Sequence, residues 1–214
     1  MRRLILALFV AVFAFSVSAQ EMNVATFNIR NGSSLKPGKA RPTKGKGDYV
    51  KFNGWDDRKD ILCDMIQFEA FDIFGVQEAF DFQVNFITSN FPEYKAVGVG
   101  RDDGKKKGEH MSIFYNKKEV TLLKWGTFWL SDTPEKPSKG WDAACFRSAT
   151  WALMKHKATG KKFYYVNTHL DHKGKEAQKN GLALIVDKIQ EINPKGYPMV
   201  LTGDFNMTPD SKEL

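Results

Sequence analysis

At several places in the chain, polar residues that could bind a metal ion or a substrate directly follow a short run of apolar residues. Glu78 follows the run 73–76, and Asp204 and Asn206 follow the run 199–202. Carboxylate oxygens are ligands that Mg²⁺ prefers. An Asp can also orient a water molecule, and an Asn can donate to a phosphate oxygen. Each feature alone has a plainer explanation, as the first polar residue of a loop or as an Asx turn that ends a strand.

A third polar cluster lies in the segment NTHLDH. In extended chain, alternation places Asn167, His169 and Asp171 on one face, so the imidazole can meet a carboxylate and a substrate together. A lone histidine at a strand end is more often structural, but this one has a carboxylate two residues away. Asn28, near the end of the apolar-rich run 22–29, is a fourth polar residue of this kind.

The elements that must position these residues follow from hydrophobic periodicity. The predicted helices are residues 55–69, 80–89 and 176–192, and the predicted strands are residues 22–29, 71–77, 94–99, 111–115, 120–130, 149–156, 163–169 and 199–202. Residues 101–108 are predicted to form a charged turn. Strands alternate with helices at both ends of the chain and run consecutively in the middle. This order favours two sheets packed face to face with helices outside over a doubly wound parallel sheet.

The N-terminus has the pattern of a secretory signal peptide. Two arginines precede the apolar run 4–15, and small residues lead up to Ala19. Cleavage is expected after Ala19. The apolar run is shorter than the roughly 18 residues that cross a bilayer, so no stable membrane anchor is expected. We therefore expect residues 1–19 to be a signal peptide, residues 20–214 to form one domain, and the protein to be exported to the periplasm or the medium.

Charge and cysteine content restrict the function classes only mildly. The net charge is +7, and the lysines are spread through loops, which indicates a solubilising surface, with a preference for polyanionic substrates as the alternative. Cys63 and Cys145 are the only cysteines, and neither has a spacing typical of a zinc site. One disulfide and two separate buried thiols remain alternatives.

Four segments, ATFNIRNG, FGVQEAF, YYVNTHLDH and LTGDFN, occur in the order seen in the endonuclease/exonuclease/phosphatase superfamily, which the chain resembles. This superfamily includes deoxyribonuclease I, apurinic endonucleases, sphingomyelinases, inositol polyphosphate phosphatases and deadenylases. The segments GWDDRKDIL, TFWLSDTPEKP and GWDAACFRSATW are most similar to its secreted bacterial branch. The resemblance implies an α+β fold, a four-layer α/β/β/α sandwich of two packed mixed sheets.

The resemblance also implies roles for single residues. Glu78 would be the main ligand of Mg²⁺ or Mn²⁺, with Asn28 nearby binding metal or phosphate. His169 would contact the phosphoryl group and stabilise its developing charge. Asp204 would orient the attacking water or its base, and Asn206 would hold a phosphate oxygen.

Four further candidates complete the predicted site. Arg147, in the segment FRSATW, resembles a phosphate-contacting arginine, with an ordinary ion-paired arginine as the alternative. Glu109 and His110 precede the strand SIFY, near the place where some members carry a catalytic tyrosine. Asp171 is included as the carboxylate closest to His169 in the sequence.

The expected function is hydrolysis of a phosphoester, above all a phosphodiester, by in-line attack of water. The substrate could be nucleic acid, a phospholipid headgroup or a sugar phosphate, and no protein partner is expected. Members of the superfamily end with a strand that carries an Asp-His pair, which is absent between Asn206 and Leu214. We therefore expect this chain to be C-terminally truncated and nearly inactive. The alternative is a non-catalytic protein of the same fold that binds a phosphate ligand.

Overall fold

The computed structural model describes residues 21–32 and 54–212. The predicted signal peptide lies outside these residues. The elements are, in chain order, β1 (Val24–Asn28), α1 (Trp55–Glu69), β2 (Ile73–Gln77), α2 (Asp81–Asn90), β3 (Tyr94–Val97), β4 (Ile113–Asn116), β5 (Val120–Trp129), β6 (Ser148–His156), β7 (Lys162–His169), α3 (Lys175–Ile192) and β8 (Met199–Asp204). Every predicted helix and strand is present, with ends shifted by a few residues. No helix in the described part of the chain is long and apolar enough to cross a bilayer.

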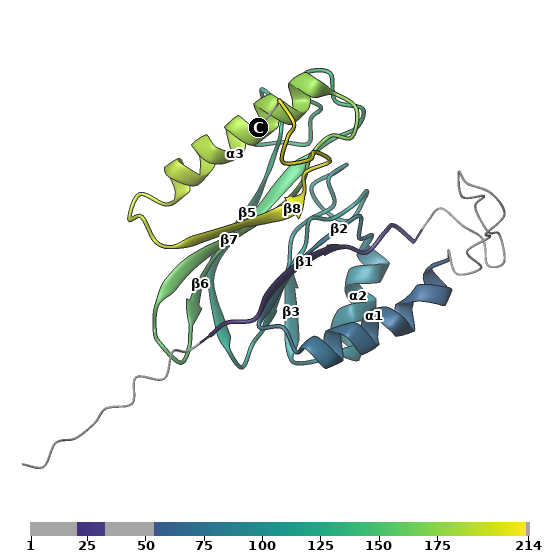
Figure 1. Cartoon of the computed structure of the whole chain (residues 1–214), viewed down its shortest axis with the longest axis vertical. Coiled ribbons are helices and arrows are strands. Elements are labelled where there is room, and N and C mark those ends of the chain that lie inside the picture. The colour runs from purple at the N-terminus through teal and green to yellow at the C-terminus, as the bar shows by residue number, and fades with distance from the viewer. Residues whose placement is uncertain (1–20, 33–53, 213–214) are drawn as a thin grey trace, which may run out of the picture.

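Within the described residues, the strands form two sheets of four, whose arrangement can be followed in Figure 1. The first sheet has the order β1-β2-β4-β3, and the second has the order β5-β6-β7-β8. Strands β1 and β2 run parallel, and so do β7 and β8, whereas the other neighbours are antiparallel. Parallel neighbours end at the same edge of a sheet. Asn28 therefore pairs with Gln77, and His169 pairs with Asp204, at the carboxyl ends of their strands.

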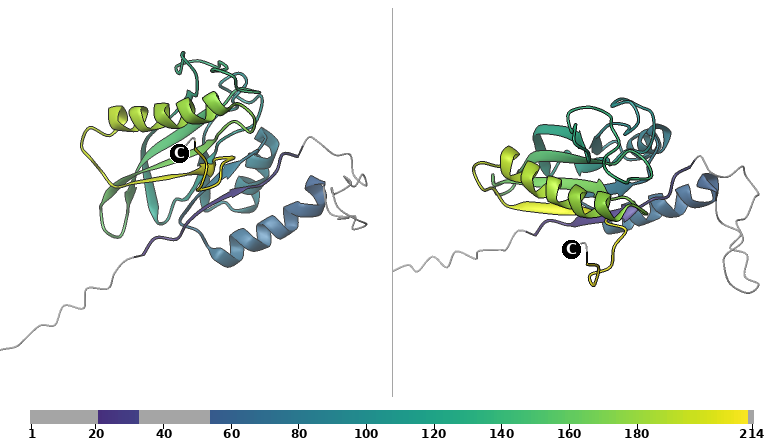
Figure 2. Two further views of the ribbon diagram at one scale, coloured as in Figure 1. Left: turned by 45° about the horizontal axis from the view of Figure 1, so that its top comes forward. Right: turned by 90° about the horizontal axis from the view of Figure 1, so that it is seen from above.

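Three apolar clusters hold the layers together. Ile66 of α1 and Ile87 of α2 pack with Phe74 on the outer face of the first sheet. Between the sheets, residues of β2, β4, β6 and β7 form a second cluster. Ile185 and Ile189 of α3 pack on the outer face of the second sheet. The views in Figure 2 show the helices on the outside of the paired sheets, so the predicted four-layer arrangement is confirmed.

Asn167 lies inside this sandwich and is fully buried. Its amide nitrogen donates to the carbonyl of Val76 at 2.8 Å, and its side-chain oxygen accepts from Nε2 of Gln77 at 2.6 Å. Because Gln77 and Asn167 are almost fully buried, these bonds satisfy polar groups that would otherwise be costly to bury. Asn167 and His169 therefore share one face of β7, as the alternation predicted, but Asn167 links the two sheets and is not open to a substrate.

Gly203 precedes Asp204 where β8 passes close to β7. A Cβ atom at Gly203 would lie 2.3 Å from the carbonyl oxygen of Thr168. The carbonyl group of Thr168 is part of the backbone of β7 and cannot move aside as a flexible side chain can. We therefore expect Gly203→Ala to destabilise the protein by about 1–3 kcal/mol. Urea unfolding measures the effect.

Gly181, inside α3, is the matched control for this substitution. A Cβ atom there would come no closer than 3.4 Å to Leu130. Alanine is the better helix former, so Gly181→Ala should be neutral or stabilising by up to about 1 kcal/mol. Equal unfolding midpoints for Gly203→Ala and the unaltered protein would contradict the steric argument.

Candidate active site

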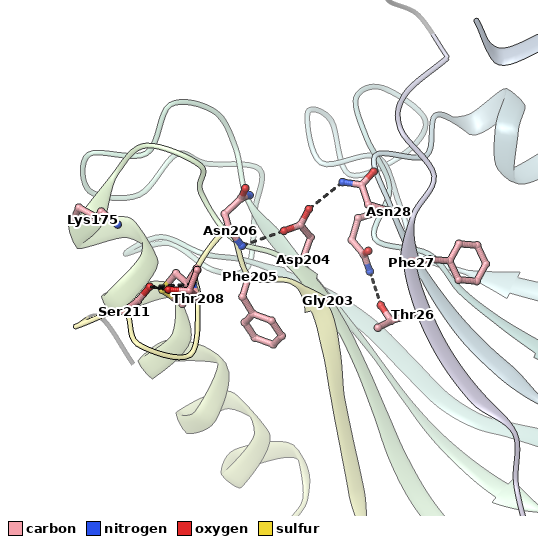
Figure 3. A pocket seen from close by; sticks show the side chains of 12 residues that line it. Thr26, Phe27, Asn28, Lys175, Gly203, Asp204, Phe205, Asn206, Thr208 and Ser211 are labelled. Atoms are coloured by element: carbon pink, nitrogen blue, oxygen red, sulfur yellow. Dashed lines mark hydrogen bonds between the residues drawn. The ribbon is translucent and has the colours of Figure 1, made fainter. Parts of the chain in front are cut away.

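Three strand ends, from both sheets, converge on one amide group. Nδ2 of Asn28, the last residue of β1, donates to Oε1 of Glu78 and to Oδ2 of Asp204, each at 3.0 Å. Glu78 directly follows β2, and Asp204 ends β8. Figure 3 shows Asn28 and Asp204 pointing toward one another across the space between β1 and β8. Residues 28, 78 and 204, far apart in the sequence, thus form one polar centre.

The backbone turns sharply where these strands end. Arg30, Glu78 and Asn206 all have positive φ angles, 55°, 61° and 50°. Few residues other than glycine adopt this left-handed conformation, and such outliers concentrate at functional sites. At Glu78 the turn directs the carboxylate toward Asn31, whose backbone N–H donates to Oε2 at 3.1 Å.

Asp204 and Asn206 do not lie side by side on an extended strand, as their spacing suggested. The backbone N–H of Asn206 donates to Oδ1 of Asp204 at 3.0 Å, which is the Asx turn weighed as the plainer alternative. Nδ2 of Asn206 donates to the carbonyl of Leu170 at 3.0 Å. The turn holds one oxygen of Asp204 in place, while the other faces Asn28.

Two cavities meet at the polar centre. The first, which we call the phosphate cavity, has a volume of about 290 Å³. It is lined by Asn31, Glu78, Arg101, Glu109, Cys145, Arg147, His169, His172, Asp204 and Asn206. The second, about 720 Å³, lies between β1 and β8 and includes Asn28, Asp204 and Asn206 (Figure 3). Of the predicted site residues, only Asp171 and His110 line neither cavity.

His169 lies beside Asp204 and not beside Asp171. Its Nε2 is 3.7 Å from Oδ2 of Asp204, so the predicted pairing with Asp171 is wrong. Burial and the nearby Arg147 lower the pKa of His169 to about 4. The imidazole is therefore neutral at pH 7. Its Nδ1 is buried and has no hydrogen-bond partner within residues 21–32 and 54–212.

Asp171 holds Arg147 in place instead. Its two oxygens accept three backbone N–H groups at 2.9–3.0 Å and Nε of Arg147 at 3.2 Å. Burial raises the pKa of Asp171, but these hydrogen bonds outweigh it and hold the pKa well below its usual range. Asp171 lines neither cavity but binds Arg147, which does line the phosphate cavity, so its predicted site role becomes a positioning role. Arg147 is ion-paired with Asp171 and also lines the phosphate cavity, and its contact with phosphate stays a prediction.

Cys145 lies beside this ion pair. Its Sγ, a carboxylate oxygen of Asp171 and a ring nitrogen of His172 all lie within 4.8 Å of one another, a spacing that could hold a metal ion. Arg147 already binds both Asp171 and His172, the latter at 2.9 Å, so an arginine occupies the place of a cation. Both cysteines are unpaired and partly buried, which decides between the two alternatives in favour of separate thiols.

Glu109 reaches the phosphate cavity, whereas His110 does not. Oε2 of Glu109 lies 2.8 Å from Nη1 of Arg101, and Oε1 lies 3.5 Å from Nδ2 of Asn31. Burial raises the pKa of Glu109, although Arg101 opposes the shift. His110 is buried and lines neither cavity, with its Nε2 3.4 Å from the carbonyl of Lys106. Arg101 was missed in the sequence, because the letters RDDGKKKG predict an exposed charged turn.

The two carboxylates of the polar centre are ionised at neutral pH. Burial raises the pKa of Glu78, but hydrogen bonds from Asn28 and the backbone of Asn31 outweigh it, and the net pKa is lowered. The pKa of Asp204 is lowered in the same way, since bonds from Asn28 and the backbone of Asn206 exceed the effect of burial. Two anionic carboxylates held together by one amide form a donor set that fits a hard divalent cation.

The chain matches the model of the Endonuclease/Exonuclease/phosphatase family over residues 25–214. Solved structures of three relatives superpose closely. A family protein from Bacteroides thetaiotaomicron is 39% identical, with a TM-score of 0.79, over 90% of this chain and 66% of that one. A mannosyl-6-phosphatase of B. thetaiotaomicron VPI-5482 is 39% identical, with a TM-score of 0.80, over 90% and 68%. A family protein of Bacteroides vulgatus is 43% identical, with a TM-score of 0.78, over 88% and 67%.

A curated relative, the uncharacterised protein L388 of Acanthamoeba polyphaga mimivirus, is 28% identical over 173 residues, which are 75% of this chain and 63% of the viral protein. The chain thus spans about two thirds of the length of these relatives. The human Nocturnin catalytic domain, at 17% identity and a TM-score of 0.61, shares the fold alone.

Proposed function

The chain belongs to the endonuclease/exonuclease/phosphatase family, and from this premise we propose that it hydrolyses phosphoester bonds with the help of a divalent metal ion, Mg²⁺ or Mn²⁺. One observation carries the proposal. Two ionised carboxylates, Glu78 and Asp204, meet at one edge of the phosphate cavity, whose lining also includes Arg101 and Arg147. Such a cavity can hold a metal cation and a phosphate anion side by side.

The metal would be held by Glu78, next to Asn28. When bound, it would supply positive charge to the phosphate oxygens and the leaving group. Oδ1 of Asn28 already accepts the backbone N–H of Arg30 at 2.8 Å, and its amide hydrogens face the carboxylates. In this arrangement Asn28 holds Glu78 and Asp204 together, and direct metal or phosphate binding by Asn28 remains a prediction.

The remaining groups act on water and phosphate. Asp204, with one oxygen held in the Asx turn, would accept a hydrogen bond from the attacking water and orient it in line with the leaving group. Neutral His169 would donate one hydrogen bond to a phosphoryl oxygen, and Arg147, positioned by Asp171, would bind another. The amide of Asn206 would hold a phosphate oxygen with the hydrogen that Leu170 does not use.

Two substrate classes compete. The sequence favoured a phosphodiester, as in nucleic acid or a phospholipid headgroup. The similarity to a mannosyl-6-phosphatase, at 39% identity over 90% of the chain, instead supports a sugar phosphomonoester. This similarity makes a sugar phosphomonoester a candidate substrate beside the phosphodiester.

Export remains part of the proposal, since the relevant residues 1–19 lie outside the described structure. The N-terminal sequence of protein recovered from the periplasm or medium would locate the cleavage site. An N-terminus at Gln20 is the expected result, and protein that stays in the cytoplasm with Met1 or Arg2 at its start would contradict it.

Metal removal tests the function. The coding DNA beyond the Leu214 codon is read first, and the protein as encoded is assayed with p-nitrophenyl phosphate, bis(p-nitrophenyl) phosphate and mannose 6-phosphate. We expect turnover that stops in EDTA and returns with Mg²⁺ or Mn²⁺. Turnover that survives chelation would contradict metal dependence. Phosphate binding without turnover of any ester would favour the non-catalytic alternative.

A further inference from the structure

Arg101 lines the phosphate cavity and carries hydrogen-bond donors that have no partner among the described residues. Its side chain is only 12% exposed. Within the described residues, its Nε and Nη1 are buried and have no hydrogen-bond partner. Oε2 of Glu109 lies 2.8 Å from Nη1, but it is off the direction of the N–H bonds and does not satisfy them. A buried cation with unused donors is a costly arrangement that an anion would relieve.

The loop that carries Arg101 is held rigidly. The backbone N–H of Arg101 donates to the carbonyl of Glu109 at 3.1 Å, and its carbonyl accepts Nε1 of Trp129 at 2.6 Å. At Gly100, a Cβ atom would lie 2.2 Å from the carbonyl oxygen of Lys107. The close approach of the backbone at residues 100 and 107 therefore requires glycine at position 100. These contacts fix the backbone of Arg101, and the contact of its Nη1 with Glu109 restrains the side chain, which reduces the entropy lost on binding.

An ion pair with Glu109 is the competing, purely structural explanation. It accounts for the charge of Arg101 but leaves two of its donor atoms unused. It also does not explain why the group lines the same cavity as Arg147 and His169, the residues that resemble phosphate contacts. Both observations are explained if Arg101 has a second, exogenous anionic partner.

We propose that Arg101 binds the phosphate of the substrate together with Arg147, and that this pair selects phosphomonoesters over phosphodiesters. The inference rests on the proposed function. A monoester carries three non-bridging oxygens and, at neutral pH, close to two negative charges, whereas a diester carries two such oxygens and one charge. A second guanidinium group therefore gains more from a monoester than from a diester. Bidentate geometry makes arginine suited to this task.

The test compares the unaltered protein with Arg101→Gln, Arg101→Lys and the control Lys105→Gln, which removes an exposed charge from the same loop. Calorimetry measures the binding of inorganic phosphate in Mg²⁺. Kinetics give KM and kcat for p-nitrophenyl phosphate and bis(p-nitrophenyl) phosphate. Arg101→Gln should weaken phosphate binding and raise KM for the monoester by about tenfold, with a smaller change for the diester. Lysine should restore part of the loss, and the control should change nothing.

Several results would overturn the inference. Phosphate binding within twofold of the unaltered protein in folded Arg101→Gln is one, and equal losses for monoester and diester are another. If Arg101→Gln does not fold, Arg101→Lys is the deciding variant. Lysine keeps the positive charge but lacks the paired N–H donors of the guanidinium group, so unchanged phosphate binding in this variant would contradict the inference. If no ester is hydrolysed but Arg101→Gln still loses phosphate binding, the proposed function fails and the assignment of Arg101 as an anion ligand stands.

Discussion

Glu78→Gln is expected to reduce kcat/KM for phosphoester hydrolysis by about 100- to 1,000-fold. The substitution keeps the size of the side chain and an oxygen that can accept from Asn28, but it removes the negative charge that would hold the metal. The concentration of Mg²⁺ needed for half-maximal activity should rise as well. Steady-state kinetics across a Mg²⁺ titration measure both effects.

Glu119→Gln is the control for this experiment. Glu119 is exposed in the turn between β4 and β5, away from the cavity residues, and its substitution removes the same charge. Both variants should have melting temperatures near that of the unaltered protein. If Glu78→Gln keeps full activity and the same metal dependence, the metal site is not at Glu78 and the mechanism fails.

Asp171→Asn is expected to have the largest effect on stability. It leaves the guanidinium of Arg147 buried without its carboxylate, and breaking one partner of a buried ion pair costs about 3–5 kcal/mol. The free energy of unfolding, from urea titration at pH 7, should fall by this amount. Asp187→Asn, on the exposed face of α3, is the control and should change it by less than about 0.5 kcal/mol.

The pH dependence of the difference in unfolding free energy between the unaltered protein and Asp171→Asn tests whether the charge of Asp171 causes this difference. The pKa of Asp171 is lower in the folded than in the unfolded protein, so its contribution is complete above the unfolded pKa, near 4, and is lost as the pH falls toward the folded pKa. The gap in unfolding free energy between the two proteins should therefore narrow from pH 5 to pH 3. A gap that stays constant would indicate lost packing instead of lost charge.

The sequence alone determined the elements and the ends of the strands that carry polar groups. Trp55–Glu69 was predicted with the same bounds as α1, because apolar spacing of 3.6 and a first turn with two aspartates are local signals. The convergence of Asn28, Glu78 and Asp204 was also foreseeable. Parallel strands in one sheet end at the same edge, which brings Asn28 near Glu78. The four ordered motifs implied a fold in which this edge of the first sheet lies beside the edge of the second sheet that carries Asp204.

Only the tertiary structure decided which polar groups meet. Strand alternation gives the side on which a residue lies, but not its neighbours from other strands. His169 therefore lies beside Asp204 and not beside Asp171, because β7 ends at His169 and the chain then turns to deliver Asp171 to Arg147. Asn167 is inside the sandwich for the same reason.

Arg101 shows this limit most clearly. Its charged surroundings in the sequence predict an exposed turn, and a turn carries no local signal of what lies beneath it. The backbone bonds to Glu109 and Trp129, residues 8 and 28 positions away, bring it to the wall of the phosphate cavity. Residue type and spacing thus identified the groups that could hold a metal and a phosphate, and long-range packing decided which of them share one cavity.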